Sequence, residues 1–290
     1  MAATDTAAGV PIFPAPWSLT GEGWIVPIYT PFSEEPIPLP DASYADLEKG
    51  TPADLSDRFH GGVGFVMIVR YTTGDAGPYD EIMYVPGLFS RSGAKDGDKP
   101  QYDFAITRIY VSTDESVANG RRNWGIPKHR ADFSFTPSGS STLLTVSHPS
   151  SPSKPFFRCL IRDSRTTPFA LPVSTSWLSS ALVRPLLSGY TPALVQPPLP
   201  AAEPDAHAVR AKGQRADALV ASERTFVVEP TATGWSRVAR IEPCGDGEGD
   251  ERTGFGDGKS FPRFEVYGQR LNVHLTSFEM QFPAPRTLAE

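Results

Sequence analysis

The segment "NWGIPKHRADF", residues 123–133, presents a single lysine, Lys128, directly after a proline. Pro127 fixes its own φ and pushes Ile126 toward an extended backbone, so Lys128 extends from a stiff, non-helical stretch. Such rigidity suits a reacting group, because small displacements of that group lower a rate strongly. A buried lysine amine that is kept neutral can attack a carbonyl carbon and form an imine. The segment therefore predicts a nucleophilic lysine, and its alternative is a surface lysine at the start of a strand.

Three segments together resemble the acetoacetate decarboxylase superfamily. "GRRNWGIPKHRADF" (120–133) is similar to its lysine motif, "TTGDAGPYDEIMYVPG" (72–87) to its Gly-x-Tyr-x-Glu strand, and "PAPWSLTGEGWIVPIY" (14–29) to its opening strand. The segments occur in the family's order and cover about the N-terminal half of the chain. The resemblance implies a mainly β (α+β) fold, a β-cone or barrel-like sheet around a pocket, a Schiff-base lysine at Lys128, no cofactor and a homo-oligomer.

The same resemblance implies roles for several side chains. Glu81 aligns with the family's active-site glutamate, and we expect it to orient the substrate or carry protons after burial raises its pKa. The expected substrate-binding residues are Tyr79 and Tyr84 as hydroxyl donors, Trp124 as a pocket wall, Arg108 and His129. Imine chemistry needs a lysine pKa lowered from about 10.4 to about 7. Desolvation or a nearby cation can lower it.

The sequence departs from the family pattern at two places. His129 stands where the family has a second lysine, a variant similar to fungal members of the superfamily, and strand alternation turns it away from Lys128. The family's carboxylate-binding cation is missing, because residues 20–23 read Thr-Gly-Glu-Gly. Arg70, Arg108 and Arg130 are candidate replacements. The missing cation leaves three functions open: decarboxylation of a β-keto acid, an aldolase-dehydratase or isomerase of secondary metabolism, and a non-catalytic small-molecule-binding protein.

The expected elements are those of one turn-rich β domain spanning residues 1–290, because 30 prolines and 25 glycines separate short β-branched and aromatic runs. A capping box at Ser112 and Glu115 predicts a helix over 113–122 that closes near Gly120. A second helix is predicted over 176–187, and the Pro/Ala-rich segment at about 190–215 is predicted to run over the surface. The predicted strands are 24–29, 64–71, 79–85, 104–111, 131–135, 142–147, 156–161, 236–242 and 263–282.

Composition excludes several classes of function. A net charge of -6 argues against nucleic-acid binding, and no run of about 20 apolar residues predicts a membrane helix. The N-terminus has no secretory signal pattern, so we expect a cytoplasmic protein. Two cysteines and scattered histidines form no metal motif. "GFGDGKS" (254–260) has one residue too few for a phosphate-binding loop. The expected partner is a small-molecule carbonyl substrate.

Overall fold

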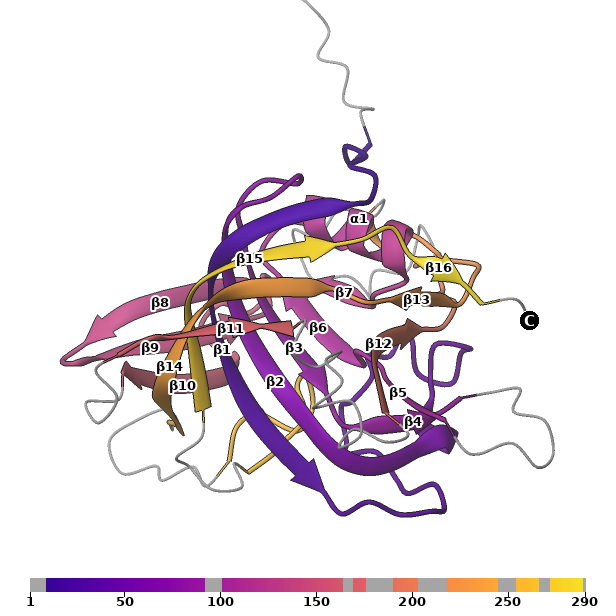
Figure 1. Ribbon diagram of the computed structural model, residues 1–290, viewed down its shortest axis with the longest axis horizontal. Coiled ribbons are helices and arrows are strands. Elements are labelled where there is room, and N and C mark those ends of the chain that lie inside the picture. Colours follow the sequence, from indigo (N-terminus) through magenta and orange to yellow (C-terminus); the bar gives the residue numbers. More distant parts are fainter. Residues whose placement is uncertain are drawn as a thin grey trace, which may run out of the picture.

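The computed structural model describes residues 9–91, 101–163, 169–175, 190–202, 218–244, 254–265 and 272–288. Strands dominate these residues, with one α-helix, α1, and one short 3-10 turn, η1 (Ser56–Arg58) (Figure 1). No helix of the described residues is long and apolar enough to cross a bilayer. The elements are β1 (Trp17–Thr30), β2 (Phe59–Thr73), β3 (Tyr79–Val85), β4 (Leu88–Ser90), β5 (Tyr102–Phe104), β6 (Arg108–Val111), α1 (Asp114–Trp124), β7 (Lys128–Arg130), β8 (Asp132–Ser138), β9 (Ser141–Ser147), β10 (Pro155–Asp163), β11 (Leu171–Ser174), β12 (Tyr190–Gln196), β13 (Phe226–Val228), β14 (Thr231–Pro243), β15 (Asn272–Phe282) and β16 (Arg286–Thr287).

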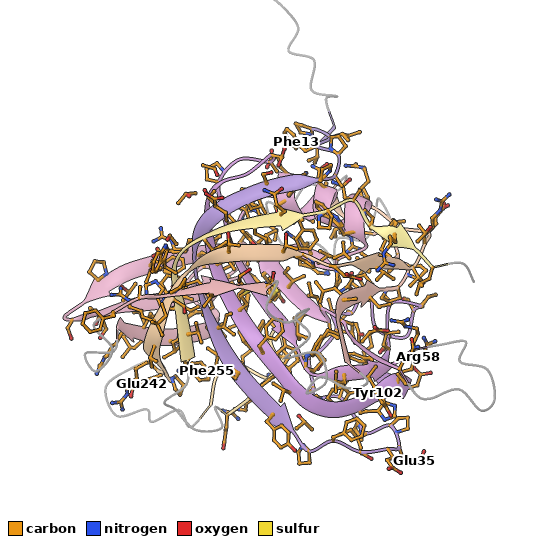
Figure 2. The ribbon with its side chains drawn as sticks, in the orientation of Figure 1. Phe13, Glu35, Arg58, Tyr102, Glu242 and Phe255 are labelled. Carbon is orange, nitrogen blue, oxygen red and sulfur yellow. The ribbon has the colours of Figure 1, made fainter. Side chains whose placement is uncertain are left out.

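The strands form one sheet built around the long strands β1 and β2. The order is β16-β13-β12-β5-β4-β2-β1-β15-β14-β10-β9-β8, and β3, β6 and β7 continue from β2 as a side branch. The chain crosses the molecule in β1, from Phe13 at one side to Glu35 at the other (Figure 2). Within the branch, β6 and β7 are parallel, with Ile109 paired to Lys128. Parallel neighbours need a crossover, and α1 supplies it.

Both faces of this central sheet are buried. On β2 and β3 the odd-numbered side chains, such as Met67 and Tyr79, belong to one hydrophobic cluster. The even-numbered ones, such as Ile68 and Tyr84, belong to another. Successive side chains on a strand point to opposite faces, so each strand contributes to both clusters. This double burial explains why the strands have nearly continuous apolar sequences instead of a clean alternation.

The ends of α1 differ from the prediction. Its N-cap is Thr113, whose hydroxyl accepts a hydrogen bond from the Ser116 backbone, whereas the Ser112 hydroxyl accepts one from the Asp80 backbone. The helix does not close at Gly120 but at Gly125, which adopts the left-handed conformation with φ 63°. Gly120 lies inside the helix. The prediction used the nearest glycine, while the residue that ends the helix is the one just before Ile126 and Pro127.

Strands lie within all the predicted ranges, with exact bounds for 79–85 and different bounds elsewhere; of the range 263–282, residues 272–282 form β15 and residues 266–271 lie outside the described residues. The run 104–111 is divided between β5 and β6, and Lys128 lies within β7 and not ahead of the next strand. The segment predicted to run over the surface begins as β12, where Ala193 and Gln196 are buried. Parallel pairing with β5 accounts for this burial, since that partner is distant in sequence. The predicted helix 176–187 and residues 203–215 lie outside the described residues.

A buried ion pair fixes α1 to the chain around it. Arg121 and Glu48 have fully buried side chains, 0% and 1% exposed, and their charged atoms lie 2.7 Å apart. The remaining Arg121 donors bond the backbone carbonyls of Val220 and Pro200. One guanidinium therefore ties the helix to three positions far away in the sequence, and its charge is compensated by Glu48.

We expect Arg121→Met to lower the free energy of unfolding by about 3 to 5 kcal/mol, because Glu48 would stay buried with less compensation. Chemical denaturation measures this change. The matched control is Arg286→Met, since the Arg286–Glu229 pair is exposed and should contribute within about 0.5 kcal/mol. Equal effects of the two substitutions would contradict the role assigned to Arg121.

Candidate active site around Lys128

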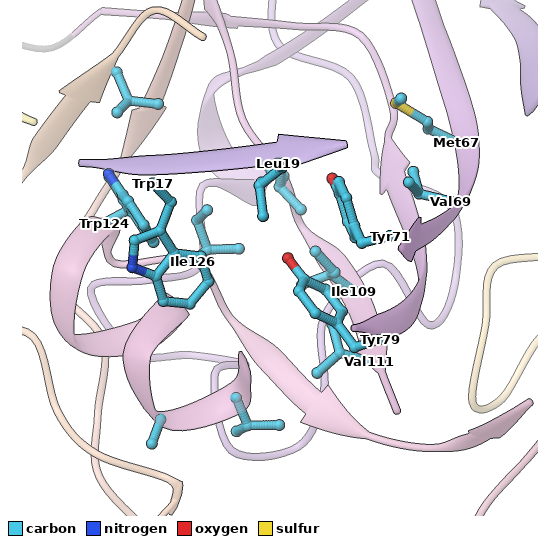
Figure 3. Close-up of a cluster of buried hydrophobic side chains, with 14 of the residues drawn as sticks. Trp17, Leu19, Met67, Val69, Tyr71, Tyr79, Ile109, Val111, Trp124 and Ile126 are labelled. Atoms are coloured by element: carbon cyan, nitrogen blue, oxygen red, sulfur yellow. The ribbon is translucent and has the colours of Figure 1, made fainter. Parts of the chain in front are cut away.

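A cavity of about 600 Å³ opens on the odd-numbered face of β2 and β3. Figure 3 shows part of its wall, with Trp17, Trp124 and Ile126 on one side and Tyr71 and Tyr79 on the other. Nearly all of the lining is apolar. The lining residues are Trp17, Leu19, Val63, Phe65, Met67, Tyr71, Tyr79, Glu81, Met83, Leu88, Phe104, Ile106, Ile109, Trp124, Ile126, Lys128, Leu194, Pro230, Met280 and Phe282.

Lys128 and Glu81 meet in this cavity as a buried ion pair. Lys128 Nζ lies 2.8 Å from Glu81 Oε2, and the two residues are only 4% and 2% exposed. The ammonium also donates to the Ser116 hydroxyl at 3.0 Å. Register explains the meeting, because β6 lies between β3 and β7 and pairs Val111 with Glu81 and Ile109 with Lys128.

Gly120 makes room for the lysine side chain. A Cβ atom at this position would lie 2.5 Å from Lys128 Cδ and 2.8 Å from its Cε. The helix therefore approaches the lysine as closely as backbone alone permits. Gly120 therefore allows α1 to pack against Lys128, and it does not end the helix.

Two tyrosines complete the polar groups of the cavity. The Tyr71 hydroxyl donates a long hydrogen bond of 3.4 Å to Glu81 Oε1, and the Tyr79 ring lies 5.0 Å from Lys128 Nζ. Burial raises the pKa of Tyr79 to about 12, although the Lys128 charge opposes the shift. Burial also raises the pKa of Tyr71, and the Glu81 carboxylate raises it further. Both phenols are therefore protonated donors at neutral pH.

The pKa of Lys128 is shifted in the direction opposite to the expected one. Burial has the largest single effect and lowers the pKa of Lys128, but Glu81 and Tyr79 together, through charge and hydrogen bonding, outweigh it, so the pKa lies above its ordinary value of 10.5. The sequence argument considered desolvation and did not place a carboxylate within hydrogen-bonding distance. In this state Lys128 is an ammonium.

Three residues predicted to bind substrate lie outside the cavity lining. Tyr84 packs on the other face against Phe261 and Phe264. Arg108 donates to the Ser260 carbonyl. Alternation could have excluded both, because even-numbered residues of β3 and β6 point away from Glu81 and Ile109.

His129 is the third. Its Nε2 lies 2.9 Å from Glu48 Oε2, so it supports the Arg121–Glu48 pair on the side away from Lys128, as alternation predicted. The pKa of Glu48 is lowered to about 2, because the charges of His129 and Arg121 outweigh the opposing effect of burial. This histidine holds the framework of the site and does not touch the cavity.

Of the other predicted site residues, some line the cavity and some lie elsewhere. Tyr79, Glu81, Trp124 and Lys128 come together, while sequence reasoning missed Tyr71 and Ser116. Tyr71 shares the face of β2 that bears Met67, and only cross-strand register with Tyr79 identifies it. The expected cations are elsewhere: Arg70 pairs with Glu22 and Asp80 on an outer groove, and Arg130 pairs with Asp132. No group of three or more His, Cys, Asp or Glu side chains in the described ranges is placed to hold a metal ion.

No protein-family model and no curated protein matches this sequence. The chain is similar to solved structures of acetoacetate decarboxylases and acetoacetate decarboxylase-like enzymes. An acetoacetate decarboxylase from Legionella pneumophila shows 13% identity and a TM-score of 0.48, over 98% of this chain and 93% of that one. An acetoacetate decarboxylase-like enzyme from Sphingomonas wittichii shows 11% identity and a TM-score of 0.47, over 96% and 94%. The enduracididine biosynthesis enzyme MppR, complexed with pyruvate, shows 14% identity and a TM-score of 0.46, over 99% and 95%.

The Lys128–Glu81 pair predicts opposite pH dependences for two proteins. The native protein should lose stability as the pH rises above about 10.5, because folded Lys128 holds its proton longer than the unfolded lysine does. In Glu81→Gln the main opposing group is removed and burial, the largest single effect, should bring the Lys128 pKa below its ordinary value. The free energy of unfolding should then rise with pH up to about 10.5.

Urea unfolding between about pH 8 and 11 measures both slopes. The matched control is Glu34→Gln, at an exposed position, which should keep the native slope. The same slope in Glu81→Gln and the native protein would show that the carboxylate does not set the lysine pKa.

Proposed function

We propose that this chain is an imine-forming carbon-carbon lyase in which Lys128 is the nucleophile. The observation that carries the proposal is a buried amine placed 2.8 Å from a buried carboxylate in an apolar cavity large enough for a small organic molecule. Such a perturbed, paired group in a cavity is typical of an active site. The motif resemblance of residues 120–133 supports the same chemistry.

Glu81 is the proton carrier of the proposed reaction. It takes a proton from the Lys128 ammonium, and the freed amine attacks the substrate carbonyl carbon. The carbonyl oxygen then receives that proton, and a second one from the nitrogen, and leaves as water. In balance, one ammonium and one carbonyl give one protonated imine and one water. Tyr79 and Tyr71, which stay protonated, donate hydrogen bonds to the developing oxygen charge.

The protonated imine then withdraws electrons from a neighbouring carbon-carbon bond. A β-keto acid would lose carbon dioxide. A β-hydroxy carbonyl compound would pass its hydroxyl proton to Glu81 and release an aldehyde, which is the aldolase-type reaction. Either route leaves an enamine, which takes up a proton at carbon, and water then releases the product from Lys128.

A second candidate is a non-catalytic protein that binds apolar small molecules. The raised pKa of Lys128 favours it, since an ammonium is not a nucleophile. In that case the ion pair is a structural feature of the cavity floor. Covalent trapping separates the two functions.

Incubation with acetoacetate, pyruvate or a neutral ketone, followed by borohydride reduction, should attach the ketone carbon skeleton to Lys128. Peptide mass mapping locates the adduct. Lys128→Ala should abolish the adduct and lower turnover by a factor of about a thousand or more, as expected when a nucleophile is lost. Lys259→Ala, at an exposed lysine, is the matched control. An adduct on another residue, or none with any carbonyl compound, would contradict the proposal.

Gly120→Ala should separate folding from reactivity. Alanine is favoured over glycine within a helix by about 1 kcal/mol, but its methyl group would push the Lys128 side chain away from Glu81. We expect a folded protein whose borohydride trapping rate falls by about tenfold or more, because positioning of the amine is lost. Arg122→Ala on the same helix should leave the rate unchanged. Unaltered trapping in Gly120→Ala would show that this close approach is unimportant.

A further inference from the structure

The polar groups of the cavity lie together. Lys128, Glu81, Tyr71 and Tyr79 adjoin one another, and Ser116 bonds the lysine from behind. Every other residue in the described lining is apolar. An occupant therefore has one place for a carbonyl oxygen and a long wall that accepts only hydrocarbon.

Charge balance disfavours an acidic substrate. Lys128 is the one cationic side chain in the described lining, and Glu81 already neutralises it. A substrate carboxylate would place two anions beside one cation in apolar surroundings, where an uncompensated charge is strongly unfavourable. A neutral carbonyl compound keeps one cation opposite one anion.

The apolar wall follows β2 away from the polar groups. Val69 is paired with Glu81, and the wall continues through Met67 and Phe65 to Val63. Six residues of strand correspond to about 20 Å. Val63 is 60% exposed, so this end of the cavity meets solvent. The lining therefore extends from the buried Glu81 to the exposed Val63.

Methionines are concentrated in the lining: Met67 and Met83 are paired on β2 and β3, and Met280 lies beside Leu19. The chain has four, Met1 among them, and the other three, Met67, Met83 and Met280, all line the cavity. Methionine side chains are flexible and polarisable, and they adapt to apolar ligands of irregular shape. A wall of this kind suits a flexible chain better than a rigid small acid.

Resting on the proposed imine chemistry, we propose that the substrate is an uncharged carbonyl compound with an extended hydrocarbon tail. Its carbonyl carbon lies at Lys128 Nζ, and its tail runs along β2 past Met67 and Met83 toward Val63. The reaction that follows is then cleavage or formation of a bond next to a neutral carbonyl, not loss of carbon dioxide.

The test is borohydride trapping of straight-chain methyl ketones from acetone upward, below their solubility limits, with pyruvate and acetoacetate as the acids. The half-saturating concentration for labelling Lys128 should fall about three- to four-fold for each added methylene, as burial of that group predicts. Both acids should label at least about tenfold less efficiently than the longer ketones. Equal or better labelling by the acids, or no dependence on chain length, would overturn the substrate class and leave the imine proposal standing.

Two variants test the path of the tail. Val63→Glu places a charge at the exposed end of the lining and should weaken labelling by long ketones about tenfold while acetone is unaffected. Leu171→Glu is the matched control, because Leu171 is also an exposed strand residue, 67% exposed, and does not line the cavity. Equal labelling of Val63→Glu and Leu171→Glu by long ketones would overturn the assigned path.

A non-covalent measurement keeps the inference independent of imine formation. The double variant Lys128→Met, Glu81→Gln removes both charges together, so no buried ion remains unpaired. Calorimetry should show that its affinity for the methyl ketones rises with chain length. If the native protein forms no imine but this variant shows the rise, the imine proposal fails and the apolar occupant stands. If the variant shows no rise, the elongated apolar occupant is excluded.

Discussion

The ion pair between Lys128 and Glu81 is the interaction on which the site depends. Removing an ammonium and a carboxylate from water costs several kcal/mol for each ion, and only a close partner with good hydrogen bonds offsets this. The 2.8 Å contact and the Ser116 and Tyr71 hydroxyl groups provide it. Each ion compensates the other, so any change that separates them leaves a buried charge without its partner.

The fold meets this requirement through register and backbone proximity. The parallel pair β6–β7 places Lys128 on the same face as Glu81, and α1, which joins these strands, comes close enough to support the lysine only because residue 120 is glycine. Arg121, the next residue, is bound to Glu48, which His129 also contacts. Lys128 and His129 are adjacent but point to opposite faces: Lys128 enters the cavity, and His129 contacts the Arg121–Glu48 pair.

Much of this site was predictable from local sequence, and the rest was not. The lysine segment, the strand bearing Glu81, the helix between and the mainly β class follow from motif and turn chemistry. Tyr84 and Arg108 lie outside the cavity lining, and alternation relative to Glu81 and Ile109 already indicated this in the sequence. Tyr71 depends on the register of the β2–β3 hairpin, Ser116 on the packing of α1 against β7, and the burial of β12 on pairing with the distant strand β5, and local motif and turn signals define none of these contacts. The raised lysine pKa depends on a 2.8 Å distance, which only the folded chain defines.

A protonated resting lysine and an imine-forming lysine are compatible when charge is followed through the reaction. The ammonium and the protonated imine both carry one positive charge, so Glu81 has a cation opposite it before and after water is lost. Proton transfer within the pair gives a neutral amine and a neutral acid, a state that an apolar cavity favours over separated ions. No proton has to leave for bulk water. The carboxylate that raises the pKa of Lys128 is therefore also the group that can release its nucleophile, provided the substrate brings no charge of its own.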